Sequence, residues 1–264
     1  MNNPMNSSQF EFARLFYSAC VRIPAIAGII ILISVSGFQV LAGDVWKDKD
    51  YEDWTSDDVY TILYESPWVK SVAKDASWIE GNASYLAAIP TDCDGRPDFS
   101  RKRETPPQLA MGLTMTLVEY RVIWMSSRTI RSAKMRESIL CGKLREETAE
   151  DFLEQEVDRY QIDVKAPDMK PFEDMDDEAI RQNTWLTFKK AKKKINPNSL
   201  RVRRMSGERR IYSISFMFDK ESEDGEAYVS PDEKEIEFTL ESGKFEVKVR
   251  FKLKKMVTKE GVDL

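Results

Sequence analysis

The chain has 264 residues, with 40 basic and 45 acidic side chains, a net charge of −5 and no histidine. The absence of histidine excludes Ser-His-Asp and Cys-His catalysis and any histidine-ligated metal site. Neither a closely spaced cysteine pair for zinc nor a glycine-rich phosphate loop occurs, so we expect no metal and no cofactor. The mildly acidic balance argues against nucleic acid as a partner, because phosphate binding requires concentrated positive charge.

Residues 1–42 are predicted to be a signal peptide. Arg14 and Arg22 precede a charge-free run over 23–43, and Val40-Leu41-Ala42 offers a small-residue cleavage site. The run is also long enough to cross a bilayer, which takes about 20 residues, so an uncleaved anchor is the alternative. We expect contact with a membrane only through this segment, and export to the periplasm or cell envelope.

Residues 43–75 are predicted to form a polar arm followed by a short helical corner. Thr55 and Asp58 are spaced as the N-cap and third residue of a helix, where each side chain can bond to the other's backbone N–H. Ser66-Pro67 predicts the end of that helix, because the residue before proline avoids the α region. The same dipeptide suits the start of a second helix, with Ser66 as N-cap and Pro67 at its first position.

Trp54 and Trp68 flank this corner and have two interpretations. They belong either to a recognition surface or to a hydrophobic corner that packs on a sheet. The second is favoured, because buried aromatic side chains usually serve packing. It predicts that both tryptophans are buried and that the corner holds the arm against the sheet.

Residues 76–264 are predicted to form an α+β domain, and its first part is irregular up to about residue 108. Cys93 lies in that part and Cys141 lies beyond it. In an oxidising compartment the two cysteines can form a disulfide, but they can equally be two separate small buried residues. Asp92 to Asp98 has the acidic and glycine content of a calcium loop, yet the twelfth position holds Arg103 instead of glutamate, so we favour an ordinary turn.

The rest of this domain reads as a mostly antiparallel sheet with several short helices on one face. The predicted strands span residues 112–126, 160–166, 185–190, 200–205, 211–218, 235–240 and 244–253. The predicted helices span residues 127–140, 146–157 and 176–183, and Ser126 or Ser127 is the expected N-cap of the first one. The last strand alternates most regularly, so one face of the sheet should be solvated and basic.

The corner also resembles a family of uncharacterised exported bacterial proteins through the motif W-T-x-x-D-V-x-x-I-L-x-x-S-P-W at 54–68. Three weaker matches are W-x-S-x-x-x-x-R at 124–131, F-x-F at 216–218 and F-K-L-K-x-M at 251–256. The resemblance implies export and a shared fold. It implies no catalytic residue, because no activity is known for the family.

Three functions remain open at this point. The leading hypothesis is a non-enzymatic interaction or structural module of the cell envelope, with an envelope protein or polymer as partner. The alternative is a carboxylate-based hydrolase of an envelope polymer, which requires two acids at a fixed separation. The third is the same exported protein held in the membrane by an uncleaved leader.

Overall fold

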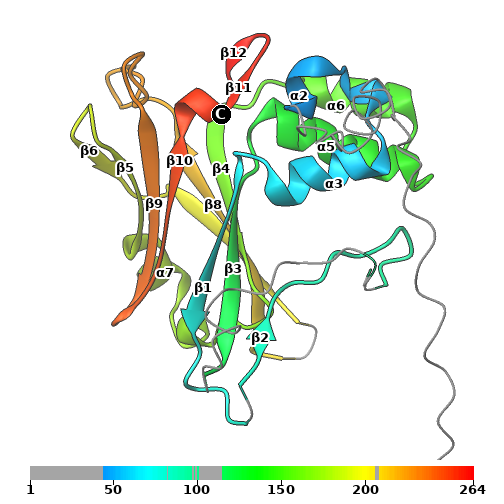
Figure 1. Cartoon of the computed structure of the whole chain (residues 1–264). Coiled ribbons are helices and arrows are strands. Elements are labelled where there is room, and N and C mark those ends of the chain that lie inside the picture. Colours follow the sequence, from blue (N-terminus) through cyan, green and yellow to red (C-terminus); the bar gives the residue numbers. More distant parts are fainter. Residues whose placement is uncertain (1–43, 82, 97, 99, 101–114, 206–207) are drawn as a thin grey trace, which may run out of the picture. The chain divides into compact units, whose positions relative to one another are not determined.

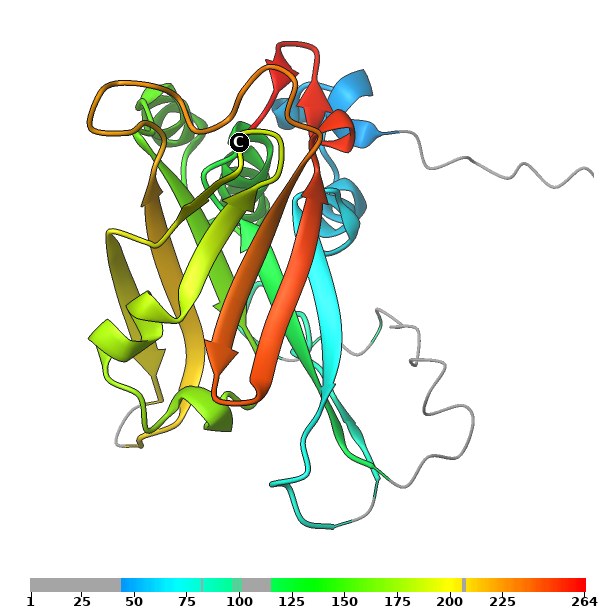
Figure 2. The ribbon, with the colours of Figure 1, turned by 90° about the vertical axis from the view of Figure 1, so that its left-hand side faces the viewer.

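Two mostly antiparallel sheets packed face to face form the centre of the protein (Figures 1 and 2). The computed structural model describes residues 44–81, 83–96, 98, 100, 115–205 and 208–264. The expected leader at 1–42 and the start of the strand expected at 112 lie outside these residues. Within them the protein has five α-helices and twelve strands, so the predicted α+β class is confirmed.

The larger sheet has the strand order β1-β3-β4-β8-β7, and a short β2 pairs with β3. Its strands are β1 (Val69–Asp75), β2 (Tyr85–Leu86), β3 (Leu117–Trp124), β4 (Arg159–Lys165), β7 (Ser199–Arg204) and β8 (Ile211–Asp219). All of these pairs are antiparallel except β2 with β3.

The smaller sheet has the order β10-β9-β5-β6 and is antiparallel throughout. Its strands are β5 (Thr184–Phe188), β6 (Lys193–Ile195), β9 (Glu235–Ser242) and β10 (Phe245–Lys252). Two further strands, β11 (Val257–Thr258) and β12 (Gly261–Val262), form a separate hairpin at the end of the chain.

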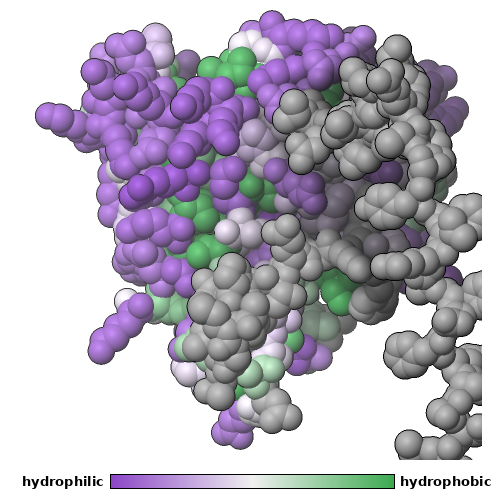
Figure 3. All heavy atoms as spheres, viewed as in Figure 1, coloured by the Kyte–Doolittle hydropathy of each residue, from purple (hydrophilic) through white to green (hydrophobic). Residues whose placement is uncertain are grey.

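Aromatic side chains fill the space between the two sheets. Trp124 of β3 meets Phe251 of β10 with ring centroids 5.1 Å apart, and Phe216 of β8 meets Phe238 of β9 at 5.7 Å. The alternation predicted for the last strand is confirmed, because the odd-numbered residues of β10 face the core and the even-numbered ones face outward. Figure 3 shows mainly hydrophilic residues over the β9–β10 side, as a solvated outer face requires.

Most of the helices gather at one end of the larger sheet, on the side away from β9 and β10 (Figure 1). They are α2 (Val45–Asp48), the 3₁₀ turn η1 (Tyr51–Asp53), α3 (Ser56–Glu65), α5 (Arg128–Leu140) and α6 (Glu146–Glu154). The predicted cap of α5 is confirmed, since the Ser127 hydroxyl accepts the N–H of Ile130 at 3.1 Å. None of the helices in the described ranges is both long and apolar enough for a membrane span.

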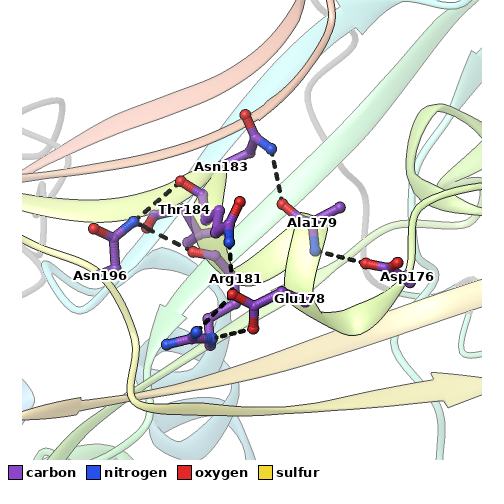
Figure 4. Close-up of polar contacts among 8 residues, drawn as sticks. Asp176, Glu178, Ala179, Arg181, Asn183, Thr184 and Asn196 are labelled. Atoms are coloured by element: carbon purple, nitrogen blue, oxygen red, sulfur yellow. Dashed lines mark hydrogen bonds and ion pairs between the residues drawn. The ribbon is translucent and has the colours of Figure 1, made fainter.

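The short helix α7 (Asp177–Gln182) leads directly into β5 and is fixed at both ends (Figure 4). Asp176 accepts the N–H of Ala179 at 2.7 Å. Beyond the C-terminal end, the Asn196 side-chain amide donates to the carbonyl oxygens of Arg181, Gln182 and Thr184 at 2.8 to 3.3 Å. The amide therefore satisfies carbonyls that a helix end leaves without partners and ties the segment after β6 to α7.

The prediction of a second helix after Pro67 is wrong. The helix α3 ends at Glu65 with Ser66 as its C-cap, and β1 begins at Val69 after a tight turn. The spacing of Val69 and Val72 fits a helix, but β-branched residues also favour strands, and pairing with β3 decides between the two. The segment is thus an end strand of the larger sheet. The described residues between 44 and 264 form one compact unit.

Candidate functional site

The start of α3 carries the cap that the sequence predicts. Asp58 N–H donates to the Thr55 hydroxyl at 3.2 Å, and the Thr55 N–H donates to the Asp58 carboxylate at 3.0 Å. The Lys49 ammonium also reaches that carboxylate at 2.7 Å, which joins the polar arm to α3. Burial works against ionisation of Asp58, but the hydrogen bonds from Lys49 and Thr55 outweigh it, so the pKa of Asp58 lies below its ordinary value of 3.8.

Trp68 connects three distant parts of the chain. It is fully buried, and its ring meets that of Trp46 in the arm edge to face, with centroids 5.3 Å apart. Its indole N–H donates to the backbone carbonyl of Asp263 at 2.7 Å. Trp68 therefore holds both the arm and the β11–β12 hairpin against the end of the larger sheet. Trp54 is also buried, at 4% exposure, so the predicted burial of both tryptophans is confirmed.

The N-terminus of α5 is occupied by the side chain of Asp263. One carboxylate oxygen accepts the N–H of Arg128 at 2.6 Å, and the other accepts the N–H of Thr129 at 2.9 Å. These are two of the donors that a helix start leaves without intrahelical partners, and the helix dipole favours the negative charge there. We call this arrangement, with the bond from Trp68, the Asp263 clasp.

A surface groove of about 660 Å³ lies beside the Asp263 clasp. Its walls come from three elements that are far apart in the sequence: the arm from α2 to Trp54, the first turns of α5, and the β11–β12 hairpin. Among the lining residues are Trp46, Lys49, Asp50, Tyr51, Glu52, Trp54, Arg128, Thr129, Ser132, Lys259, Glu260 and Asp263. Figure 1 shows β11 and β12 next to α2 at this end of the molecule.

The groove combines aromatic walls with charges of both signs. The Lys259 ammonium lies 3.6 Å from the Asp50 carboxylate, so a salt bridge joins the hairpin to the arm. The indole N–H groups of Trp46 and Trp54 are buried and have no acceptor within the described ranges, which leaves two indole donors of the groove wall unsatisfied. A buried donor without a partner is uncommon in folded proteins. The groove therefore presents half-buried aromatic rings and charges of both signs to the solvent.

The structure brings only part of the predicted motif to this groove. Trp54 lines it, and Trp68 supports it through Trp46 and Asp263. Thr55 and Asp58 cap α3, whereas Ser66 and Pro67 end that helix and turn the chain into β1.

Cys93 and Cys141 form a disulfide, with their Cα atoms 5.1 Å apart. The bond ties the irregular segment after β1 to the residue that follows α5. The Asp92 side chain beside it accepts the N–H groups of Asp94 and Arg96 at 2.9 and 2.8 Å, as expected of a turn residue. No group of three or more potential metal ligands is found in the described part of the chain.

A row of buried and half-buried polar residues crosses the outer face of the larger sheet, and sequence reasoning missed it. Arg121 of β3, Lys165 of β4 and Ser213 of β8 are register partners, and Arg121 is only 5% exposed. Burial lowers the pKa of Lys165, although the charge of Asp163 opposes this change. The Arg121 guanidinium lies 4.4 Å from the centre of the Tyr64 ring in α3, so the helices cover part of this face. Alternation along a strand cannot show that a second layer covers its polar side.

Comparison with protein-family models, with curated proteins and with solved structures gives no match to this chain.

Proposed function

We propose that the protein is an exported, non-enzymatic module of the cell envelope that binds a partner protein or polymer in the groove beside the Asp263 clasp. The observation that carries this proposal is the groove itself, because three distant segments are held together to form its walls. Its tryptophan and tyrosine residues and Arg128 are of the residue types that are enriched at binding surfaces.

Two features support export. The leader at 1–42 has the basic start, apolar centre and V-x-A ending of a signal peptide. The Cys93–Cys141 disulfide fits an oxidising compartment, since such bonds are rare in the cytosol. The resemblance of the 54–68 motif to exported bacterial proteins agrees with both.

Binding is favoured over hydrolysis because two of the four carboxylates of the groove, Asp50 and Asp263, already have structural partners. Asp263 caps α5, and Asp50 is paired with Lys259. A glycosidase-type reaction needs one carboxylic acid and one carboxylate, both facing the substrate. Asp263 and Asp50 instead hold the walls of the groove in place.

Site-specific photo-crosslinking tests this proposal in the native cell envelope. A photoreactive residue replaces Glu52, which lines the groove, and in a control replaces Lys244, an exposed residue of the β9–β10 turn. We expect one discrete adduct from position 52 and none from position 244. We also expect Lys259→Glu, which reverses a charge of the groove wall, to reduce that adduct several-fold. Equal adducts from both positions, unaffected by Lys259→Glu, would contradict groove binding.

A further inference from the structure

The hairpin formed by β7 and β8 ends in a group of exposed arginines. Five exposed side chains make up this group, which we call the arginine patch: Arg201, Arg203, Arg204, Arg209 and Arg210. β7 is an end strand of the larger sheet, so the patch lies at its edge. Arg201 and Arg203 project from the outer face of β7, because Val202 between them packs against the core opposite Ile214.

Contacts across the turn hold the arginines close together. Arg204 Nη1 donates to the carbonyl oxygen of Arg209 at 2.7 Å, and the Met205 N–H donates to that of Arg210 at 2.9 Å. The other two arginines precede Arg204 by at most three residues, which is about 10 Å of strand. The patch therefore occupies one end of the larger sheet, opposite the end that carries the β11–β12 hairpin (Figures 1 and 2).

Few counter-charges reach the arginine patch. Arg209 pairs with Asp174 at 2.9 Å, and Arg210 pairs with Glu208 at 3.4 Å. Both pairs are solvent-exposed, so each contributes little to stability. The other three arginines pair with no carboxylate in the described part of the chain. Five arginines and two carboxylates thus leave a local charge of +3, although the whole chain carries −5.

A second basic run, at the turn between β5 and β6, is neutralised to a greater extent. Lys189 pairs with Glu235, and Lys193 pairs with Glu226 at 3.4 Å. The chain therefore supplies carboxylates to one basic turn and leaves most of the arginine patch open.

Two exposed apolar side chains stand among the arginines. Met205 is 42% exposed, and its sulfur lies 3.8 Å from Arg210 Nη1. Tyr212 is 43% exposed, although both of its neighbours along the chain are buried. The register of β7 and β8 shifts at this point, so Tyr212 has no partner on β7, and such a β-bulge re-aims a side chain. A charged edge that only prevents pairing with another sheet gains nothing from exposed apolar groups.

We propose that the arginine patch, with Met205 and Tyr212, docks the protein on the surface of an anionic membrane. Guanidinium groups bind the phosphate oxygens of lipid headgroups through paired hydrogen bonds, and each basic residue near an anionic leaflet adds to the attraction. Tyrosine and other apolar side chains suit the boundary between headgroups and acyl chains. A soluble polyanion would engage the same arginines but offers no apolar layer to Met205.

This contact is additional to any made by the leader, and it is independent of the groove. The patch and the groove share no residue, and they lie at opposite ends of the larger sheet (Figure 1). The groove therefore stays accessible while the patch is on a membrane, and either proposal can fail without the other.

Cosedimentation with lipid vesicles at low ionic strength tests the docking, with the protein isolated from the envelope fraction of its own cells. Vesicles of phosphatidylglycerol and phosphatidylcholine supply the anionic surface, and phosphatidylcholine alone measures any binding through residues 1–42. We expect the wild type to prefer the anionic vesicles. The triple variant Arg201→Gln, Arg203→Gln, Arg204→Gln should bind them at least about tenfold more weakly, because three unpaired charges are lost.

Two further variants separate the patch from net charge and from simple charge attraction. Lys143→Gln, Arg145→Gln, Lys192→Gln removes three exposed basic residues elsewhere, and this matched control should bind nearly as the wild type does. Met205→Ser with Tyr212→Ser keeps every arginine and should bind the anionic vesicles several-fold more weakly, because the apolar contacts with the lipid are lost.

A gain of binding provides a test that does not depend on weakening the protein. Asp174→Asn with Glu208→Gln frees Arg209 and Arg210 from their carboxylates and should strengthen binding several-fold. All the replaced side chains are on the surface, so melting followed by circular dichroism should match the wild type and shows that each variant is folded.

Three results would overturn the proposal. The first is a wild type that binds anionic and neutral vesicles equally, and the second is an equal loss in the arginine variant and its matched control. The third is full binding by the variant that lacks Met205 and Tyr212, which would assign the patch to soluble polyanions instead of a membrane.

Discussion

Replacing Trp68 by alanine should destabilise the packing of the arm and of the β11–β12 hairpin against the larger sheet. The side chain is fully buried, and truncation of such a residue typically costs about 3–5 kcal/mol. Trp68 also loses its hydrogen bond to the Asp263 carbonyl, worth about 1 kcal/mol, and its ring contact with Trp46. We therefore expect the free energy of unfolding to fall by about 4–5 kcal/mol, near the upper end of this range.

Urea unfolding followed by far-ultraviolet circular dichroism measures this loss without relying on tryptophan fluorescence. A slope of about 2 kcal/mol per molar urea converts the expected change into a midpoint about 2 M lower. Trp68→Phe, which keeps most of the packing but not the N–H donor, should recover the larger part of the difference. Trp185→Ala is the matched control, because Trp185 is half-exposed and its ring contacts Lys194 on the outer face of the smaller sheet. A Trp68→Ala midpoint equal to that of the wild type would contradict the role of Trp68 in holding these segments together.

Three other expectations follow from single contacts. Asp263→Ala removes the acceptor of two helix N–H groups and should lower the free energy of unfolding by about 1–2 kcal/mol in the same urea assay. An unchanged free energy of unfolding would show that Asp263 does not stabilise the start of α5. Replacing Cys93 and Cys141 by serine removes a disulfide between residues 48 positions apart. The free energy of unfolding should fall by about 4 kcal/mol, because the unfolded chain gains conformational entropy. A wild-type melting curve that reductant leaves unchanged would contradict this expectation. Because the pKa of Asp58 is lowered on folding, its ionised form stabilises the fold above about pH 4, and this contribution is lost as pH falls through the folded pKa. Asp58→Asn should therefore destabilise the protein at pH 7 but much less at pH 3, and equal losses at both values would disprove the linkage.

Local signals account for the parts of the fold that the sequence predicted well. The caps at Thr55 and Ser127 depend on residues within one helical turn, and the alternation of β10 depends on near neighbours. The same local reasoning failed after Pro67, because a short apolar segment fits a helix and a strand equally well. Only the partner strand β3, more than 40 residues further on, decides the outcome.

Most of the candidate site could not be predicted from the sequence, because its contacts join residues that are far apart along the chain. Trp68 and Asp263 are separated by 195 positions, and nothing near Asp263 marks it as a helix cap. The alternative between a disulfide and two separate cysteines was equally open, since it depends on the Cα separation of Cys93 and Cys141.

The most direct test of the central claim is the intact mass of the protein isolated from the envelope fraction of its own cells, measured without reductant. An exported, disulfide-linked module predicts a chain that begins near Gly43 and is two hydrogens lighter than its fully reduced form. A chain that keeps residues 1–42, carries two free thiols at Cys93 and Cys141 and is recovered from the cytosol would contradict it.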